Sequence, residues 1–523
     1  MKKNLLVSRV LLLVMIISLV LLCLPACNKS DGGGESVTQE GVKVYELSFN
    51  VWGYQDQFQG GLQPKYYDEV ADAINEKLQK DRGFRLKFKP LYYPADSATE
   101  RMNTELASGK RIELLKAQNY VDIFTNYVEK GLVTDIKPFL DAKGKYLKEG
   151  IEQVAWDEYT KDGAVYGIPN VDFQFSTGGW IRGDWLKALG LETPKSFAEL
   201  ENVLEKFKTG DLDKNGQADT VALCGNYNNI FNYLFGLYTD KPGDFVENGN
   251  VKLYIQSPGF KQTLETMASW YKKGYIDDNI FEDNVHQISA NLFSRGKTGV
   301  EISNIWNIEW GNLKSVNTSN PEMDLRFLPV PQESKAYMVE KVASAYNFIP
   351  KSCKYPEIVV SYLDWIAESE ENYLLSQAGM GILDKTYVLD KNNAPDIPPA
   401  EKELGVKDGQ ILSGPYTNFQ YSKFSFKYLP ASTPAQTRVA YNWSLAIPTE
   451  KLYRSVVRSN ALVLPQNVRV KSSDATLIAN EDIQKVIKGT MTYEAFISDW
   501  LSKGGKEVTD EYTKLYNDLE NKK

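Results

Sequence analysis

The sequence is poor in histidine and cysteine, and the shortage of histidine argues against two classes of enzyme. His286 is the only histidine among 523 residues. A Ser-His-Asp triad needs a histidine base and zinc enzymes usually need two or three histidine ligands, so both classes are disfavoured. Only Cys224 and Cys353 lie beyond the N-terminal region, because the other two of the four cysteines fall within the first 27 residues. These two could form a disulfide outside the cell, or they could be separate buried thiols.

The chain also lacks internal repeats, long basic patches and a second long apolar run. Its formal net charge of −8 argues against a nucleic-acid partner. The one long apolar run lies at the N-terminus, which excludes a protein that crosses the membrane several times. With 42% apolar and 24% charged residues, the composition is typical of a globular protein. Its length suggests about three domains or two large lobes.

The N-terminus has the pattern of a secretory signal peptide. Residues 1–9 include Lys2, Lys3 and Arg9, and residues 10–24 are apolar except for one serine. A basic segment, a short apolar segment and a site with small residues define such a peptide. A transmembrane anchor would need about 20 apolar residues. We therefore expect residues 1–26 to be a signal peptide.

The end of this segment predicts a lipid anchor. Residues 24–27 read Leu-Pro-Ala-Cys, which resembles a bacterial lipobox, in which Cys27 becomes the lipid-modified first residue. Residues 27–42 are rich in glycine, serine and charge, a composition typical of a flexible tether. A folded body on such a tether would lie at the extracellular face of the cell membrane.

The first part of the chain after the expected tether is predicted to form an α/β unit. Side chains alternate over 44–52 and over 84–88, and between them a helix runs from Pro64 to Gly83 with an apolar residue at every fourth position. Strand, helix and strand at this spacing indicate parallel strands covered by helices. Later segments predict helices, one with a capping box at its start, over 196–208, 356–368, 481–488, 493–502 and 508–519.

Several motifs, in a fixed order, resemble the extracellular solute-binding proteins of carbohydrate ABC importers, particularly the large lipoprotein members of Gram-positive bacteria. The resemblance spans essentially the mature chain. The motifs are Tyr159–Pro169 (YTKDGAVYGIP), Trp180–Leu186 (WIRGDWL), Leu191–Leu200 (LETPKSFAEL), Trp270–Asp277 (WYKKGYID), Phe293–Gly299 (FSRGKTG) and Trp500–Gly505 (WLSKGG).

This resemblance implies a two-lobed fold like that of maltose-binding protein, with a ligand cleft between hinge-connected lobes. Lobe one would contain 43–170 and 340–430, and lobe two 171–339 and 431–523. The implied function is that of a lipid-anchored extracellular receptor that captures an oligosaccharide and delivers it to the permease subunits of an ABC importer. We expect a monomer that is not an enzyme and has no catalytic cofactor.

A sugar site needs flat aromatic rings for the C–H faces of the sugar and amides or carboxylates for its hydroxyls. Such residues should lie where strands end and loops begin. Tryptophans on amphipathic helices, such as Trp270 and Trp365, are expected in the core instead. The expected ligand-binding residues are Trp52, Tyr54, Asp172, Phe175, Trp180, Asn226, Asn228, Asn304, Trp306, Trp310, Tyr441 and Trp443.

One loop resembles the first nine residues of an EF-hand calcium loop. Oxygen donors occupy loop positions 1, 3, 5 and 9, Gly216 occupies position 6, and a backbone carbonyl is available at position 7. Position 12 is Ala222, so the usual bidentate glutamate is missing. The alternative is an Asx-rich surface turn. We expect structural Ca²⁺ here, held by Asp211, Asp213, Asn215, Gln217 and Asp219.

Two other functions fit the composition. A secreted glycosidase needs only a pair of carboxylates, which 68 acidic residues supply many times over. A receptor for peptides or anionic solutes is the other alternative. Aromatic and asparagine-rich loops favour neutral sugars, and the net negative charge would repel anions at a distance.

Overall fold

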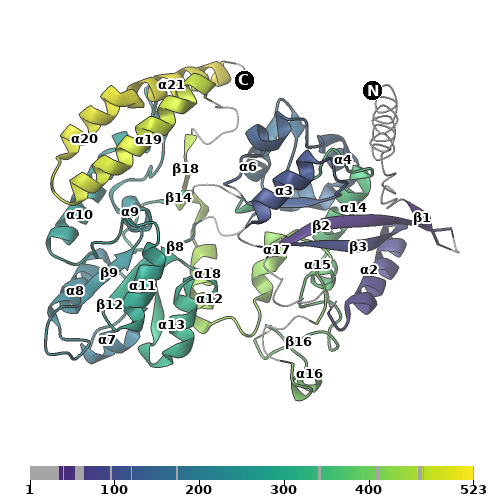
Figure 1. Cartoon of the computed structure of the whole chain (residues 1–523), viewed down its shortest axis with the longest axis horizontal. Helices are drawn as coiled ribbons and strands as arrows, with labels where there is room; N and C mark the ends of the chain where they lie inside the picture. Colours follow the sequence, from purple (N-terminus) through teal and green to yellow (C-terminus); the bar gives the residue numbers. More distant parts are fainter. Residues whose placement is uncertain are drawn as a thin grey trace, which may run out of the picture.

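The computed structural model describes residues 35–38, 41–52, 64–94, 97–118, 120–171, 175–339, 343–392, 394–406, 412–456, 462 and 464–521. The expected signal peptide, Cys27 and most of the expected tether lie outside the described residues, as do Tyr54 and Asp172. The described chain forms two lobes that lie side by side (Figure 1).

The expected strand–helix–strand unit is confirmed at the start of lobe one. Strands β2 (Lys43–Trp52) and β3 (Phe84–Tyr93) pair in parallel over ten residues, and α2 (Tyr67–Arg82) connects them. The apolar residues at every fourth position of α2, Val70, Ile74 and Leu78, are fully buried. Short β1 (Ser36–Val37) adds an antiparallel strand to β2.

A second sheet in lobe one joins distant parts of the chain. Its order is β4 (Leu115–Gln118), β15 (Ala345–Phe348) and β7 (Ile168–Asn170), and β15 is antiparallel to both neighbours. Lobe one is therefore not purely parallel. Its helices are α3 (Ala98–Ala107), the π-helix η2 (Phe124–Val128), α4 (Lys137–Lys143), α5 (Lys145–Gly150), α6 (Gln153–Asp157), α14 (Pro356–Glu368), α15 (Glu370–Ser376), α16 (Pro399–Glu403) and α17 (Ser422–Ser425).

Lobe two is built on a four-stranded mixed sheet. The order is β13 (Leu325–Leu328), β8 (Thr177–Arg182), β12 (Thr298–Asn304) and β9 (Val221–Gly225). Strands β12 and β9 are parallel, whereas β8 is antiparallel to β12 and β13. The helices around it are α7 (Gly183–Ala188), α8 (Phe197–Thr209), α9 (Tyr227–Tyr238), α10 (Pro258–Lys272), α11 (Val285–Ser294), α12 (Asn307–Trp310), α13 (Leu313–Ser319) and α18 (Ala435–Leu445).

Three C-terminal helices pack on lobe two, away from lobe one (Figure 1). They are α19 (Gln466–Ile487), α20 (Tyr493–Trp500) and α21 (Lys506–Glu520). The expected helix over 481–488 is only the last part of the much longer α19. Phe496 and Trp500 are buried in the same hydrophobic core as α8 and α10, so these helices belong to lobe two by packing.

The expected core tryptophans are confirmed. Trp270 and Trp365 are fully inaccessible to solvent, each in the core of a different lobe.

Among the described helices, none combines the length and apolar character needed to span a bilayer. The remaining paired segments are β5 (Thr160–Lys161) with β6 (Ala164–Val165), β10 (Phe245–Glu247) with β11 (Asn250–Lys252), β14 (Tyr337–Val339) with β18 (Leu452–Arg454), and β16 (Val388–Leu389) with β17 (Pro395–Asp396).

Candidate functional site

A pocket of about 360 Å³ opens in lobe one beside Trp52, the last residue of β2. Trp52 is half-buried and forms part of the lining. The pocket lies at the carboxyl ends of β2 and β4, where α/β proteins commonly place ligands. Its lining residues come from β2, β4, α15, the segment 377–380 that follows α15, and the segment 415–420. They are Asn50, Val51, Trp52, Lys116, Tyr373, Gln377, Ala378, Met380, Pro415, Thr417, Asn418, Phe419 and Gln420.

A chain of amide hydrogen bonds fixes the polar part of this lining. The side chain of Asn50 donates to the carbonyl of Lys116 (2.9 Å) and accepts from its N–H (2.7 Å), which ties the end of β2 to β4. Asn418 donates to Asn50 Oδ1 (2.9 Å), and Asn347 on β15 donates to Asn418 Oδ1 (2.5 Å). Three segments far apart in sequence therefore hold one another's amides in place.

The sequence reasoning missed Asn50 and Asn418. One signal pointed to Asn50, because it and Ser48 are the polar positions in the otherwise apolar second half of the strand, residues 47–52. No local pattern marks Asn418, whose role depends on contacts with β2 and β15. Tyr120, just beyond β4, is 75% exposed in the structure.

In lobe two, the expected aromatic residues Trp306 and Trp443 lie near the ends of strands and on α18. Trp306 follows β12 and precedes α12, and it is half-buried against the same core cluster that Trp443 contacts. The ring of Trp443 packs against Phe327 with centroids 5.3 Å apart, and it remains partly exposed. Figure 1 shows α18 and α12 on the side of lobe two that faces α17 and the tip of β2 in lobe one.

A buried glutamate joins the two elements that carry these rings. Glu309 on α12 accepts a hydrogen bond from the hydroxyl of Tyr441 on α18 (3.0 Å) and another from Thr433 (3.0 Å). Burial raises the pKa of Glu309, and the two hydroxyls counteract part of that shift. Because both carboxylate oxygens are used in this way, Glu309 fixes α12 relative to α18.

Three expected ligand residues are core residues instead. Trp180 on β8 is fully buried, packs against Phe327, and donates from Nε1 to the carbonyl of Asn304 (3.0 Å). Phe175 is 4% exposed and Tyr441 is 5% exposed. A buried ring has no free face for a sugar, so the expectation of stacking at these three positions was wrong. Their burial comes from neighbours on other strands and helices, which the local sequence does not show.

The expected asparagines have mixed roles. Asn226 caps α9, since its Oδ1 accepts from the N–H of Asn228 (2.8 Å). The side chain of Asn228 is exposed and that of Asn304 is half-buried at the end of β12. Trp310 is the last residue of α12, and its side chain lies outside the described part of the chain. These positions remain candidates for contact with a ligand.

The single histidine, His286, contacts a buried glutamate of β12 in lobe two. His286 Nδ1 on α11 lies 3.3 Å from Oε1 of Glu301, which is fully buried on β12. The other oxygen of Glu301 accepts from the side chain of Asn307 (2.6 Å), the first residue of α12. The hydrogen bond to Glu301 raises the pKa of His286, and burial raises the pKa of Glu301.

The loop expected to hold calcium contains a lysine among its carboxylates. Lys297 Nζ lies 2.5 Å from Asp213 Oδ2 and 3.0 Å from both oxygens of Asp219. Asn215 donates its amide to the same two residues (3.0 Å each). The other oxygen of Asp213 is buried with no hydrogen-bond partner. Within the described ranges, no three His, Cys, Asp or Glu side chains are grouped as metal ligands. The donor set suits Ca²⁺, provided that the ammonium of Lys297 moves away.

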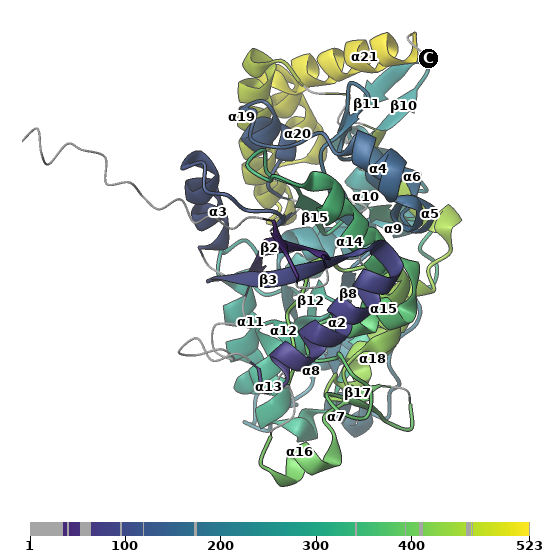
Figure 2. The ribbon, with the colours of Figure 1, turned by 90° about the vertical axis from the view of Figure 1, so that its right-hand side faces the viewer.

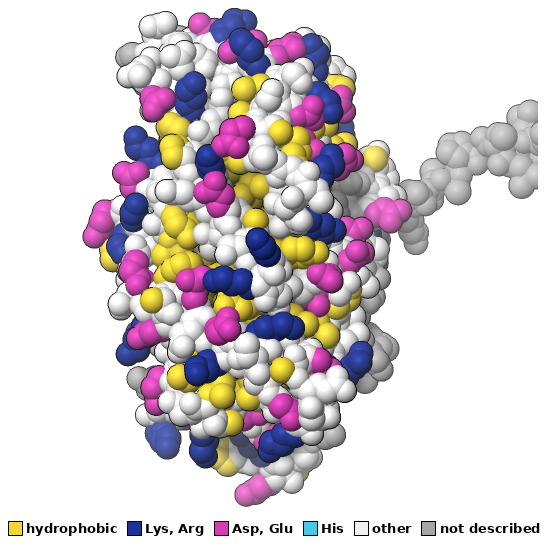
Figure 3. All heavy atoms as spheres, turned by 90° about the vertical axis from the view of Figure 1, so that its left-hand side faces the viewer, with side chains coloured by type: hydrophobic (Ala, Val, Ile, Leu, Met, Phe, Trp, Pro, Cys, Tyr) yellow, Lys and Arg dark blue, Asp and Glu magenta, His cyan; other side chains and the backbone are white. Residues whose placement is uncertain are grey.

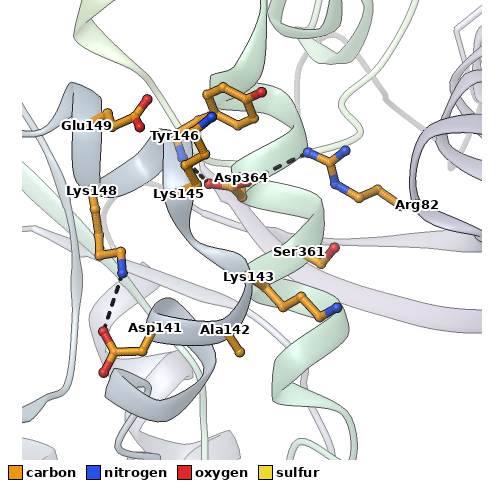
Figure 4. Close-up of a pocket in the computed structure, with 10 residues that line it drawn as sticks. All are labelled: Arg82, Asp141, Ala142, Lys143, Lys145, Tyr146, Lys148, Glu149, Ser361 and Asp364. Atoms are coloured by element: carbon orange, nitrogen blue, oxygen red, sulfur yellow. Dashed lines mark hydrogen bonds and ion pairs between the residues drawn. The ribbon is translucent and has the colours of Figure 1, made fainter.

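A larger hollow of about 690 Å³ lies on lobe one between α4, α5 and α14 (Figure 4). Two pairs of its charged groups contact each other, Lys148 with Asp141 (3.4 Å) and Arg82 with Asp364. Asp364 accepts from the N–H groups of Tyr146 (2.6 Å) and Leu147 (3.1 Å) and lies 3.7 Å from Arg82. Figure 2 shows α2, α4, α5 and α14 on the side of lobe one that faces away from lobe two. None of the expected ligand residues lines this hollow.

The alternative left open for the two cysteines is resolved. Cys224 and Cys353 are free thiols, and Cys224 is buried where its thiol contacts the carbonyl of Val300 (3.3 Å). Arg182 is paired with Asp184 by two hydrogen bonds.

On the face of lobe two shown in Figure 3, basic and acidic side chains are interspersed, so that face presents mixed charge.

Comparisons with known proteins assign the family. A family described as bacterial extracellular solute-binding protein matches residues 60–373. The polygalacturonan/rhamnogalacturonan-binding protein YtcQ of Bacillus subtilis (strain 168) is 25% identical over 538 residues, covering 97% of this chain and 98% of YtcQ. The fructooligosaccharide ABC transporter substrate-binding protein FusA of Streptococcus pneumoniae serotype 4 is 28% identical over 243 residues, which is 42% of this chain and only 44% of FusA.

Among solved structures, the N-glycan transport solute binding protein NgtS from Streptococcus pneumoniae has a similar fold. It superposes with a TM-score of 0.60 at 17% identity, covering 91% of this chain and 100% of NgtS. The expected two-lobed α/β fold is thereby confirmed. The chain belongs to the family of bacterial extracellular solute-binding proteins.

Proposed function

We propose that the protein is a lipid-anchored extracellular receptor that captures an oligosaccharide between its lobes and delivers it to an ABC permease. The observation that carries this proposal is that a polar pocket in lobe one and two partly exposed tryptophans in lobe two belong to the sides on which the lobes face each other. A polar pocket beside Trp52 lies at the tip of β2 in lobe one. The partly exposed Trp306 and Trp443 belong to the start of α12 and to α18, two helices on the side of lobe two that faces lobe one (Figure 1). Amides suit sugar hydroxyls, and aromatic rings suit the C–H faces of sugars.

Capture would occur by hinge closure. The chain passes between lobes near residues 170, 340 and 430, and we take 43–170 with 340–430 as lobe one and the rest of the body as lobe two. A ligand that contacts both lobes binds the closed state more tightly than the open state, so it shifts the population toward closure.

The names of the relatives support a carbohydrate as the ligand. YtcQ is named for binding polygalacturonan and rhamnogalacturonan, and FusA for fructooligosaccharide. The relatives are named as binding or transport proteins, which favours a receptor over a glycosidase. Attachment through Cys27, transfer to permease subunits and a monomeric state are parts of the proposal that rest on the sequence.

We also propose that the loop over 211–219 binds structural Ca²⁺. The support is the set of oxygen donors at EF-hand spacing, together with the buried Oδ1 of Asp213 that has no partner. In the structure the ammonium of Lys297 balances the negative charge of Asp213 and Asp219. Because a lysine side chain is long and flexible, Ca²⁺ could displace it while the loop backbone keeps its shape.

Calorimetric titration tests the proposed function. Chain 28–523 should be titrated with neutral fructo-, manno- and xylo-oligosaccharides, oligogalacturonides, and a peptide control. We expect one class of oligosaccharide to bind at about micromolar affinity, or near −8 kcal/mol. Cleavage of a bound glycan would favour the glycosidase, and binding of the peptide alone would favour the other alternative. If no glycan in the panel binds, the proposal fails.

A further inference from the structure

A buried carboxylate on β12 holds the start of the helix that follows Trp306. Glu301 is fully inaccessible to solvent, and its Oε2 accepts a hydrogen bond from the side chain of Asn307 (2.6 Å), the first residue of α12. The same amide nitrogen of Asn307 donates to Ser303 Oγ (3.0 Å), so both of these anchors lie on β12. Trp306 immediately precedes Asn307. The position of Trp306 is therefore set partly by Glu301.

Helix α12 depends on such anchors because it contains only four residues. A helix this short has little stability of its own, since the first turn costs more entropy than one hydrogen bond returns. Two buried carboxylates hold it: Glu301 through Asn307, and Glu309 through the hydroxyls of Tyr441 and Thr433. A change at either carboxylate can therefore alter how firmly α12 is held.

The other oxygen of Glu301 faces the single histidine of the chain. His286 Nδ1 on α11 lies 3.3 Å from Glu301 Oε1. The side chain of His286 is 36% exposed, whereas that of Glu301 is fully buried. The imidazole can thus exchange protons with solvent, and its protonated form supplies the positive charge that a buried carboxylate needs. Through His286, the charge balance at Glu301 follows the pH of the solvent.

The elements around this pair carry few other groups that could titrate with it. The strand register places Glu301 opposite Cys224 on β9 and opposite Trp180 on β8, and burial raises the pKa of the Cys224 thiol, which stays neutral. Helix α9 contains no charged residue. The other titratable or charged groups near the pair and α12 are Asp277 after α10, Glu309 on α12, Lys314 on α13 and Arg438 on α18. The two cations act on Glu309, whereas His286 acts on Glu301.

Loss of the proton from His286 weakens the anchor of α12. Without the imidazolium, Glu301 is a buried unpaired carboxylate, and burial favours its protonated form. A hydrogen bond from Asn307 to a neutral carboxyl group is about half as strong as one to a carboxylate. Helix α12 is then held less firmly, and a ligand that contacts Trp306 must order it on binding, which costs affinity.

We infer that His286 positions α12 through Glu301 and Asn307, so that the protein binds its glycan more tightly when His286 is protonated than when it is neutral. The inference rests on the proposed function, because it requires Trp306 to contact the glycan. His286 is a positioning residue, since its ring contacts Glu301.

The test measures affinity against pH. His286 is the only histidine among the 523 residues, and neither neutral glycans nor sugar carboxylates change charge between about pH 6 and pH 9. Chain 28–523 should be titrated calorimetrically, well below its melting temperature, with the oligosaccharide identified above. The affinity of the wild type should fall about 3- to 10-fold from pH 6 to pH 9.

Two variants assign this change to the pair. His286→Gln keeps a donor for Glu301 without a charge, so its affinity should be the same at both pH values. Glu301→Gln keeps an acceptor for Asn307 and should also give a flat profile, and it serves as the second variant if His286→Gln does not fold. Lys130→Gln, an exposed charge change in lobe one, is the matched control and should follow the wild type.

The outcomes separate this inference from the proposed function. If the wild type binds a glycan equally well at both pH values, or more tightly at pH 9, the inference is wrong and the receptor stands. It is also wrong if His286→Gln keeps the full pH dependence, or if the variants change only the melting temperature. If the wild type binds no glycan at all, the proposed function fails and this inference fails with it.

Discussion

Two tryptophans show two different arrangements of the same type of side chain in this protein. Trp270 is fully buried, stacks on Phe197 at a centroid distance of 5.9 Å, and donates from Nε1 to Glu201 (2.9 Å). Trp443 contacts the core with part of its ring and leaves the rest exposed. Only the second arrangement leaves a surface on which a sugar can stack.

Trp443→Ala should therefore weaken glycan binding, by roughly 10- to 150-fold if the ring contributes about 1.5–3 kcal/mol. Trp270→Ala should lower the free energy of unfolding by about 3–5 kcal/mol with or without ligand. Calorimetric titration and thermal melts of both variants measure these effects. Normal binding by Trp443→Ala would remove this ring from the site.

The pair of His286 and Glu301 predicts a pH dependence of stability. The pKa of His286 is higher in the folded state than in the unfolded state, because Glu301 stabilises the imidazolium. The stabilisation of the folded state by this pair is therefore fully present below the unfolded pKa of histidine, about 6.5. It is lost as pH rises through the pKa of His286 in the folded state. It also needs an ionised Glu301, whose raised pKa sets the acidic limit.

We expect the melting temperature of His286→Gln to fall below that of the wild type at about pH 6, and the difference to shrink by pH 9. Parallel melts over this range provide the measurement. Lys130→Gln, an exposed charge change in the other lobe, is the control for general charge effects. A difference between His286→Gln and the wild type that is constant with pH would contradict the prediction.

At the scale of elements, the loop over 211–219 joins α8 to β9. Its backbone is held by hydrogen bonds from the N–H groups of Asn215 (2.9 Å) and Gly216 (3.1 Å) to the carboxylate of Asp211. Gly216 has a φ of 86°, which favours glycine. The loop can thus keep its shape with either Ca²⁺ or the ammonium of Lys297 among its carboxylates.

If Ca²⁺ binds, chelation with EDTA should lower the melting temperature, and Asp213→Ala should abolish that sensitivity. Lys297→Met removes the competing ammonium and should increase Ca²⁺ affinity, measured by titration with Ca²⁺. Unchanged melting of both the wild type and Lys297→Met on chelation would mean that the loop is an Asx-rich turn balanced by Lys297.

At the scale of the whole molecule, the proposed lipid anchor on Cys27 predicts that the protein is held at the membrane. Cys27→Ala should release the protein from the membrane or leave an uncleaved precursor, because no thiol remains at the lipobox position. Cys353→Ser, which alters a free thiol in the folded body, should stay in the membrane fraction. Fractionation with lipid labelling makes the comparison, and lipid-labelled attachment of Cys27→Ala would sink the prediction.

The elements set by local sequence were predictable. Apolar spacing identified α2, β2 and β3, and the Ser196–Glu199 capping box is present at the start of α8, with Glu199 N–H donating to Ser196 Oγ (3.2 Å). Helix α14 has the predicted bounds, 356–368. These patterns act over a few residues, since periodicity and capping depend on neighbours within one or two turns.

The sequence by itself determined the family motifs, the α/β start of lobe one and the residue types available for a sugar or a calcium ion. Only the tertiary structure decided which of them are accessible. Trp180 and Trp443 both looked like ligand residues, yet strands from elsewhere bury the first and leave the second partly open. Lys297, which immediately precedes β12, contacts the carboxylates of the calcium-like loop, and β12 pairs with the strand β9 that follows this loop. Burial and charge balance depend on residues far apart in the chain, and no local pattern encodes them.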